Sequence, residues 1–589
     1  MPWFGLARRT TLLPLMMVAP ALSGCADAEP EVAGLGLALT GPAGPGLPPD
    51  VAFLRVLTRV GDAAPALQVS AVDGLDSQAG HHQLALPDLP AGSRVSVRVE
   101  GQLASGEIAY VGAVGPFLLV GGERLSQSVT LVSASESQAV ASAPPGRFLH
   151  AASALADGRV LITGGFGEPT SSDCPAGVAE TARCFRARAL QDAWLFDPNG
   201  LSFHQVAGGL LEARAGHTSS VLPDGRVLVA GGAREALLVF DAGTPRLPRF
   251  FPLDASGAAS ASASFELFEP DANADSVRDP GRGRFVGSAP TPAMAAPLLA
   301  ARFLHAAANV PSAPGQVLLV GGANGPLTSQ TYERFDAQRA GGYGVAQDTR
   351  GLLAVEREAP SALGLQGTGA DAVWIFSGTY PRSNDDLAER WVASSAPQGS
   401  ISSATTTAFP EASADAPPTP HPEYAFPRAL AARFSGHTRA LLATAYPPFC
   451  GDSDAPTFPP TSLADPAGSC HQPADLVRCM LLDAASGAAT PCTTMYPHLA
   501  GAAAELDDAV LLSGGMTDLA GMVSLGIERF QLDPSDPTQL IALPVLSLAA
   551  ARSFHTSTGL PEGGALSVGG LRFDSGAPLL ADGAEFVRW

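Results

Sequence analysis

Residues 214–232 read Arg-Ala-Gly-His-Thr-Ser-Ser-Val-Leu-Pro-Asp-Gly-Arg-Val-Leu-Val-Ala-Gly-Gly, with an Asp-Gly pair in the middle and two glycines at the end. Asp-Gly is a strong signal for a tight hairpin turn because glycine accepts the positive φ that such turns require. The run Arg-Val-Leu-Val fits a short strand, and a glycine pair is expected where backbones crowd or a strand bulges. The pattern therefore predicts two adjoining antiparallel strands.

The same pattern recurs along the chain. Four copies share an Arg-x-x-His start and a Gly-Gly end, and the step from His to the first Gly is 14, 14, 16 and 14 residues. These copies contain His150 with Gly164 and Gly165, His217 with Gly231 and Gly232, His305 with Gly321 and Gly322, and His555 with Gly569 and Gly570. Three weaker copies cover 371–378, 433–445 with His437, and 508–515 with Gly514 and Gly515 but no corresponding histidine. Such self-similarity is the signature of a repeat architecture.

A third apolar strand follows the glycine pairs, as in Phe265-Glu-Leu-Phe-Glu-Pro270 and Tyr332-Glu-Arg-Phe-Asp336. The whole pattern, over about three quarters of the chain, resembles the bacterial form of the Kelch family. The resemblance implies a β-propeller of four-stranded blades around a central channel. Seven copies imply seven blades. We expect the last blade, which stops after its third strand, to be completed by residues 137–143, which would close the ring and cover an edge.

The repeated histidines, His150, His217, His305, His437 and His555, raise the possibility of a metal site. A zinc ion needs its ligands within about 2.1 Å. Residues that occur once per blade in equivalent places would instead be spread around the ring. We therefore expect structural histidines, each bonded to the backbone of a neighbouring blade, and no metal.

Residues 31–135 precede the repeat and contain runs such as Arg94-Val-Ser-Val-Arg-Val99, whose period of two is typical of a half-buried strand. The turn before it, at 86–93, resembles that of bacterial Ig-like and transthyretin-like β-sandwiches. We therefore predict an all-β protein, with a small β-sandwich stalk at 31–135 and a propeller at 137–589. The alternative for the first part is an irregular extension of the propeller.

The first 24 residues have the pattern of an export signal. Two arginines precede the apolar run 10–22, which is too short to span a membrane and is interrupted by prolines. Leu22-Ser-Gly-Cys25 resembles the bacterial lipobox, which implies a lipid on Cys25, with residues 25–30 as a tether. By the same resemblance, Ala26 after the cysteine favours the outer membrane. The alternative is an ordinary signal peptide with an incidental cysteine.

The six remaining cysteines fit disulfides in an oxidising compartment because their number is even. Cys174 and Cys184 lie in one expected loop and are the most natural pair. The other four allow three pairings, of which we favour Cys450–Cys470 with Cys479–Cys492. Unpaired buried thiols are the alternative.

The copies average about 63 residues, longer than the usual Kelch unit of roughly 50. The surplus lies in insertions at 166–191, 242–263, 271–299, 379–425 and 446–478, and binding residues usually lie on such loops. One insertion has the spacing of a calcium loop, with oxygen ligands at Asp271, Asn273, Asp275 and Asp279. A serine stands where a calcium loop has its turn glycine, and an arginine stands where it has its bidentate glutamate. We therefore favour a solvated acidic loop, with calcium as the alternative.

The net charge of −21 disfavours binding to nucleic acid. The sequence contains no His-Glu-x-x-His, no Gly-x-Ser-x-Gly and no phosphate-binding loop with lysine. Some Kelch propellers belong to copper-radical oxidases, but we find no clear counterpart of their tyrosine, cysteine and histidine set. We predict an envelope lipoprotein, without catalytic residues or cofactor, that binds a protein or glycan partner. The alternative is an exported carbohydrate-active or copper-radical-oxidase-like enzyme.

Overall fold

The computed structural model describes residues 32–589 with gaps. The longer gaps are 241–247, 271–280, 288–296, 339–342, 367–370, 379–387, 404–429, 446–476 and 517–522, and the shorter ones are 43, 62, 79–80, 135, 177, 179, 255, 326, 346, 355, 377, 395, 397, 497, 508, 561, 575–576 and 582. In the described part the regular structure is β, apart from two short 3-10 turns at Val72–Gly74 and Gln347–Thr349, and it contains no α-helix. This confirms the prediction of an all-β fold.

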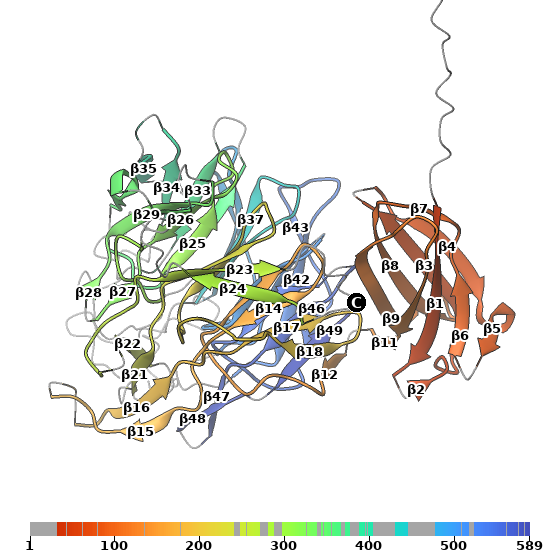
Figure 1. The fold of residues 1–589 in the computed structure, drawn as a ribbon, viewed down its shortest axis with the longest axis horizontal. Coiled ribbons are helices and arrows are strands. Elements are labelled where there is room, and N and C mark those ends of the chain that lie inside the picture. The colour runs from red at the N-terminus through yellow and green to blue at the C-terminus, as the bar shows by residue number, and fades with distance from the viewer. Residues whose placement is uncertain are drawn as a thin grey trace, which may run out of the picture.

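Residues 32–133 form two sheets that face each other (Figure 1). Along β1 every second side chain is buried, which is the predicted period of two. The inward side chains of both sheets, such as Leu37 and Val97, form one hydrophobic core. The first sheet has the order β10-β1-β6-β5, with β2 and β7 also paired to β1: β1 (Val32–Gly41), β2 (Gly44–Pro45), β5 (Asp76–Gln78), β6 (His81–Ala85), β7 (Leu89–Pro90) and β10 (Arg124–Thr130). The second has the order β11-β9-β8-β3-β4: β3 (Val51–Val60), β4 (Ala66–Ala71), β8 (Arg94–Leu103), β9 (Ile108–Leu118) and β11 (Val132–Ser133).

Most of the remaining described chain folds into small antiparallel sheets of four or five strands, in which the strands of one copy of the repeat pair with one another. The first three are β13 (Ala151–Ala154), β14 (Val160–Thr163), β17 (Ala193–Asp197) and β18 (Ser202–Gln205); β19 (Thr218–Val221), β20 (Val227–Ala230), β23 (Phe265–Pro270) and β24 (Gly283–Gly287); and β25 (Ala306–Asn309), β26 (Gln316–Val320), β29 (Thr331–Asp336), β30 (Gly344–Val345) and β31 (Gly351–Leu352). The Asp-Gly pairs lie in the first turns of the first two sheets, where Gly158 and Gly225 have φ of 86° and 85°.

The next sheets continue the series. They are β32 (Ser361–Leu365), β33 (Ala372–Phe376), β34 (Ala388–Val392) and β35 (Ser400–Ser403); β36 (Leu430–Arg433), β37 (Arg439–Ala445), β38 (Val477–Asp483) and β39 (Ala489–Cys492); β40 (Ala502–Glu505), β41 (Val510–Ser513), β42 (Gly526–Leu532), β43 (Leu540–Ala542) and β44 (Leu546–Ser547); and β45 (Thr556–Gly559), β46 (Ala565–Val568), β49 (Ala584–Val587) and β12 (Ser137–Ala139). In the last of these sheets β12 pairs antiparallel with β49, at the position expected for residues 137–143.

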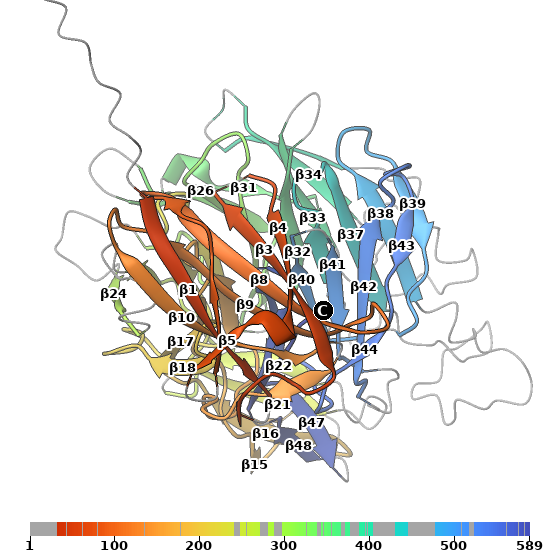
Figure 2. The same cartoon turned by 90° about the vertical axis from the view of Figure 1, so that its right-hand side faces the viewer.

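The sheets are arranged in a propeller-like way around an axis (Figure 2). The first strand of each sheet contacts the first strand of the next, in the cyclic order β13, β19, β25, β32, β36, β40, β45 and back to β13. We call the sheets that contain these strands the ring. The second strands, such as Val160–Thr163 and Val227–Ala230, are buried along their whole length because they pack between neighbouring sheets. The apolar runs of the repeat therefore form a series of small cores between sheets, such as the one around Leu161 and Val229.

Two of the inserted loops build a further sheet, which we call the plug sheet. It has the order β15-β16-β21-β22, with β15 (Thr170–Ser172), β16 (Arg183–Arg188), β21 (Glu235–Phe240) and β22 (Arg249–Leu253). β15 and β16 come from the loop between β14 and β17, and β21 and β22 from the loop between β20 and β23. Corresponding loops of other sheets form the hairpins β27 (Ala323–Asn324) with β28 (Leu327–Thr328), and β47 (Leu571–Asp574) with β48 (Ala577–Leu580).

Candidate functional site

The glycine pairs connect neighbouring sheets. The N–H of Gly165 donates to the carbonyl of Arg214 in the next sheet (3.0 Å). Gly164 has a φ of 53°, and a Cβ added there would lie 2.2 Å from the same carbonyl oxygen. Only glycine fits this position, because it combines a left-handed backbone with a close approach of another chain. The same N–H bond joins Gly232 to Arg302, Gly322 to Arg357, Gly515 to Arg552, and Gly570 to Arg147.

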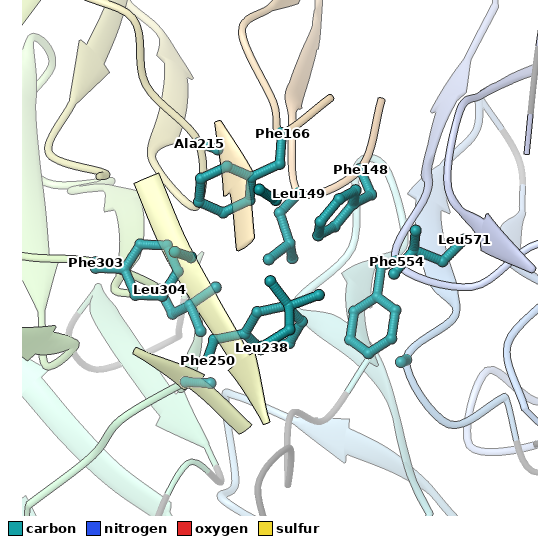
Figure 3. Close-up of a cluster of buried hydrophobic side chains, with 14 of the residues drawn as sticks. Phe148, Leu149, Phe166, Ala215, Leu238, Phe250, Phe303, Leu304, Phe554 and Leu571 are labelled. Carbon is teal, nitrogen blue, oxygen red and sulfur yellow. The ribbon is translucent and has the colours of Figure 1, made fainter. Parts of the chain in front are cut away.

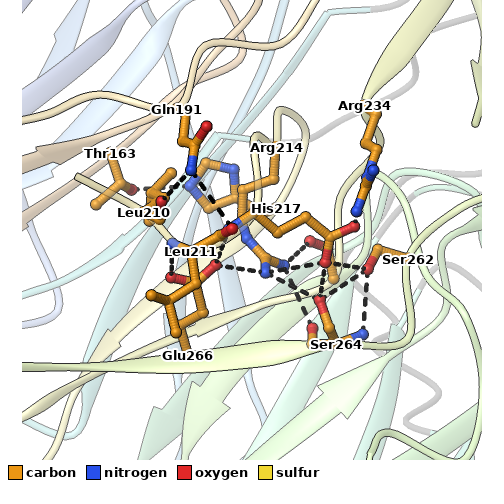
Figure 4. A network of polar contacts seen from close by, with 12 residues as sticks. Thr163, Gln191, Leu210, Leu211, Arg214, His217, Arg234, Ser262, Ser264 and Glu266 are labelled. Atoms are coloured by element: carbon orange, nitrogen blue, oxygen red, sulfur yellow. Dashed lines mark hydrogen bonds and ion pairs between the residues drawn. The ribbon is translucent and has the colours of Figure 1, made fainter. Parts of the chain in front are cut away.

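The motif arginines are buried and paired with an acidic side chain of the same sheet (Figure 4). Arg214, 1% exposed, donates to the carbonyl of Gly231 (2.6 Å) and to Glu266 (2.7 Å). Glu266 also accepts the backbone N–H groups of Leu211 and Glu212, at 2.6 and 3.0 Å. The pair therefore ties the start of the repeat to its third strand. Equivalent pairs are Arg147–Asp192, Arg302–Glu333, Arg357–Glu389 and Arg552–Glu585.

These pairs were not predicted from the sequence, although both partners recur. In the four sheets where the arginine pairs with a glutamate, that glutamate is the second or third residue of the third strand, as with Glu266 in Phe265–Pro270 and Glu333 in Thr331–Asp336. A recurrent charged residue inside an otherwise apolar strand was the available signal, because a buried carboxylate requires a partner.

The sixth sheet replaces the arginine with His498. Its Nδ1 lies 2.8 Å from the carbonyl oxygen of Gly514 and its Nε2 lies 2.9 Å from Glu528. The two contacts join His498 to the same kinds of partner, a glycine carbonyl and a glutamate, that Arg214 has in its sheet. Burial raises the pKa of Glu528, but the bond from His498 and two backbone N–H bonds outweigh this and hold that pKa below its ordinary value. The sequence pattern assigned no histidine to this copy, so His498 was not predicted.

The motif histidines bond to hydroxyl groups. The Nε2 atom lies 2.7 Å from Thr556 in His150, 2.8 Å from Thr163 in His217, 2.9 Å from Thr218 in His305 and 3.0 Å from Ser513 in His555. Each hydroxyl belongs to a neighbouring sheet, as expected, but the expected backbone partner is wrong. Burial and then the nearby Arg214 charge lower the pKa of His217 to about 3. Burial likewise holds the pKa of His150 and His555 well below the ordinary value, so these rings are neutral.

His437 does not belong to this set, and its assignment to the motif is wrong. It lies in the exposed turn between β36 and β37, and its backbone N–H bonds to Phe434. The first strand of this sheet ends at Arg433, so the Arg-x-x-x-His spelling follows the strand instead of preceding it. In the described part of the chain, no group of three or more His, Cys, Asp or Glu side chains is placed to hold a metal ion.

The first strands surround a cavity of about 320 Å³ on the axis of the sheets. Small side chains line it, including Ala307 and Ser219, together with His150 and Thr556. Some polar groups of the wall are hydrogen-bonded: Ser219 lies 2.5 Å from Ser153 of a neighbouring sheet, and His150 lies 2.7 Å from Thr556. The side chains of the wall are uncharged, but their imidazole and hydroxyl groups make it polar.

Hydrophobic side chains close one end of this cavity (Figure 3). The ring contributes Phe148 and Leu149 and their equivalents Phe303, Leu304 and Phe554, and the plug sheet contributes Leu238 and Phe250. The ring centroid of Phe250 lies 5.4 Å from that of Phe554 and 6.4 Å from that of Phe148. Leu149 and Phe554 also border the cavity, so the cluster forms its floor. The inserted loop 166–191, expected to carry a binding surface, thus supplies β15 and β16 of the plug sheet, and the insertion 242–263 supplies β22, whereas β21 with Leu238 precedes that insertion.

The fourth sheet brings a carboxyl group to this floor. Glu358 follows Arg357 as Phe148 follows Arg147, so it occupies the position that Phe148 has in the floor. Burial raises the pKa of Glu358 to about 7, while the charge of Arg249, in β22 of the plug sheet, acts against this. The floor of the cavity is therefore polar on the side of the fourth sheet.

The sandwich formed by residues 32–133 contacts the opposite end of the ring. Each first strand runs from the plug to a turn at the far end, and three such turns meet the sandwich. Arg94 donates to Ala156 (2.7 Å), Arg59 lies 3.6 Å from Asp507, and Ser96 donates to Glu562 (2.5 Å). Arg98 adds bonds to the main-chain oxygens of Glu562 (2.7 Å) and Trp589 (2.5 Å).

Two predicted disulfides are present. Cys174 and Cys184 connect β16 to the preceding loop, with their Cα atoms 5.2 Å apart. Cys479 and Cys492 connect β38 to β39, with Cα atoms 4.8 Å apart. The other assigned residues lie outside the described part: Cys25, Cys450, Cys470, and Asp271, Asn273, Asp275 and Asp279 of the calcium-like loop.

Comparisons with known proteins give no assignment: no protein-family model matches the chain, and no curated protein matches it. Among the described residues, no helix has the length and apolar character needed to cross a bilayer.

Proposed function

We propose that this protein is an exported lipoprotein in which a closed, seven-bladed Kelch-type propeller is displayed on a β-sandwich stalk and binds a protein or glycan of the cell envelope. The cyclic contacts of the first strands support a closed ring. The bond from Gly570 to Arg147 and the pairing of β12 with β49 join the last copy to the first in the same way. The two disulfides suit an oxidising, exported environment.

The observation that carries the binding role is the plug sheet. The polar residues of the repeat serve the framework, because the arginines pair with acids and the histidines bond to hydroxyls of neighbouring sheets. Among the described residues the plug sheet is the largest addition to that framework, and a disulfide holds one of its hairpins. Binding residues usually lie on loops over a rigid scaffold. We place the docking surface on the outer side of this sheet, at the end of the ring opposite the stalk.

Two matched arginines test this assignment. Arg188, on β16 of the plug sheet, is 84% exposed and bridges Glu235 at 3.0 Å. Arg284, on β24 away from the plug, is 76% exposed and bridges Glu269 at 2.8 Å. Immobilised full-length protein is exposed to envelope extract and to a glycan array. We expect Arg188→Glu to lose a captured species that wild type and Arg284→Glu retain.

Equal capture by the two variants would place the partner elsewhere, and capture no better than by an unrelated lipoprotein would contradict a binding role.

The lipid anchor is tested separately. We expect Cys25→Ala to leave the membrane fraction, whereas unchanged membrane association of that variant would contradict lipidation at this residue.

A further inference from the structure

Three large apolar side chains are exposed at one end of the stalk. Val32 begins β1 and is 46% exposed, and Leu118 and Val120 are 57% and 55% exposed. Leu119 between them is 2% exposed and belongs to the stalk core, so its neighbours point outward. The Gly122 N–H donates to the carbonyl of Val32 (3.0 Å), which holds the start of β1 against the turn that follows Val120.

This end of the stalk is also the end that the tether reaches. Val32 lies seven positions after Cys25 along the chain. A fully extended chain spans at most about 3.4 Å per residue, so Val32 can lie no further than about 24 Å from a lipid-bearing Cys25. Such a short tether also gives a high effective concentration of this end at the bilayer surface.

We infer that Val32, Leu118 and Val120 contact the lipid bilayer, so that the stalk stands end-on at the membrane. This inference rests on the proposed lipidation of Cys25. Exposed apolar groups gain by leaving water, and the lipid interface is the apolar phase within reach of the tether. Because Arg98 and Ser96 hold the stalk to the far turns of the ring, the contact also sets how the propeller is presented to the membrane.

Tryptophan quenching by brominated lipid tests the contact. Full-length acylated protein is reconstituted into phosphatidylcholine–phosphatidylglycerol vesicles, and the fluorescence added by Leu118→Trp is measured over that of the native tryptophans. The control is Phe53→Trp, at a 43% exposed position near the start of β3, which is the end of the sheet away from Leu118. We expect brominated lipids to quench the fluorescence added by Leu118→Trp and to leave that of Phe53→Trp unchanged, and we expect Val120→Asp to weaken the quenching.

The outcomes separate the contact from the anchor. If the protein floats with the vesicles but the two added tryptophans are quenched equally or not at all, the contact is refuted while the anchor stands. If Cys25 carries no lipid by mass spectrometry and the protein does not float, both proposals fail. If Leu118→Trp instead reports concentration-dependent dimerisation without vesicles, a second copy covers these residues and the lipid contact is refuted.

Discussion

Replacing Glu358 by glutamine should make the ring more stable at neutral and alkaline pH and leave it unchanged in acid. In the folded protein, burial raises the pKa of this carboxyl from 4.5 to about 7. Between these two values the folded state holds a proton that the unfolded state has lost, so stability falls as the pH rises. A difference of this size corresponds to about 3 kcal/mol above both pKa values. It is an upper limit, because the side chain is only partly buried.

Urea unfolding of wild type and of Glu358→Gln, from about pH 4 to pH 8, measures the effect as a difference between two curves, in which other titrating groups cancel. The two midpoints should coincide in acid and separate above pH 5, with the variant more stable. The matched control is Glu356→Gln, which removes the same charge from an exposed glutamate two residues away. A constant offset between wild type and Glu358→Gln, or a variant that is less stable at pH 8, would refute the reasoning.

Three further predictions concern the framework. Glu333→Gln leaves Arg302 buried without its counter-charge and should cost about 3–5 kcal/mol in urea unfolding, whereas loss of a surface pair costs about 1 kcal/mol or less. Gly231→Ala should destabilise more than Gly225→Ala, since both have positive φ but only the Gly231 Cβ would meet a backbone, at 2.6 Å; equal losses of melting temperature would contradict this. Because the pKa of Glu528 is lowered, the stability that Glu528→Gln removes should be largest above the ordinary glutamate pKa of about 4.3 and should vanish as the pH falls below its folded pKa.

The hairpins and the glycine pairs could be predicted because their causes are local. Glycine takes the positive φ of this turn at the least cost, so Gly158 and Gly225 mark the same turn in two copies. The Gly-Gly motif likewise recurs where a carbonyl group of the next sheet approaches closely, as at Gly164. These constraints act on the residue itself and therefore leave a readable repeat.

The plug sheet could not be predicted from the repeat, because its pairing joins two different copies. β16 pairs with β21, and the residues in register, such as Arg188 and Glu235, lie almost fifty positions apart. Neither segment recurs in other copies, so no period marks it. The prediction of the motif histidines failed in the degenerate copies for another reason. His498 performs the arginine's contacts with different chemistry, and His437 resembles the motif in spelling but follows its strand.

The plug has a physical reason that follows from the repeat itself. The residue before each motif histidine takes a left-handed backbone, with φ of 50° at Leu149, 55° at Leu304 and 54° at Phe554. In a non-glycine residue this costs about 1–2 kcal/mol, so the position needs compensation. The three side chains lie together at the end of the cavity, where Leu238 and Phe250 of the plug sheet cover them. Without that cover the ring would expose a contiguous apolar patch. The insertions thus complete the core first, and any partner they bind meets their outer side.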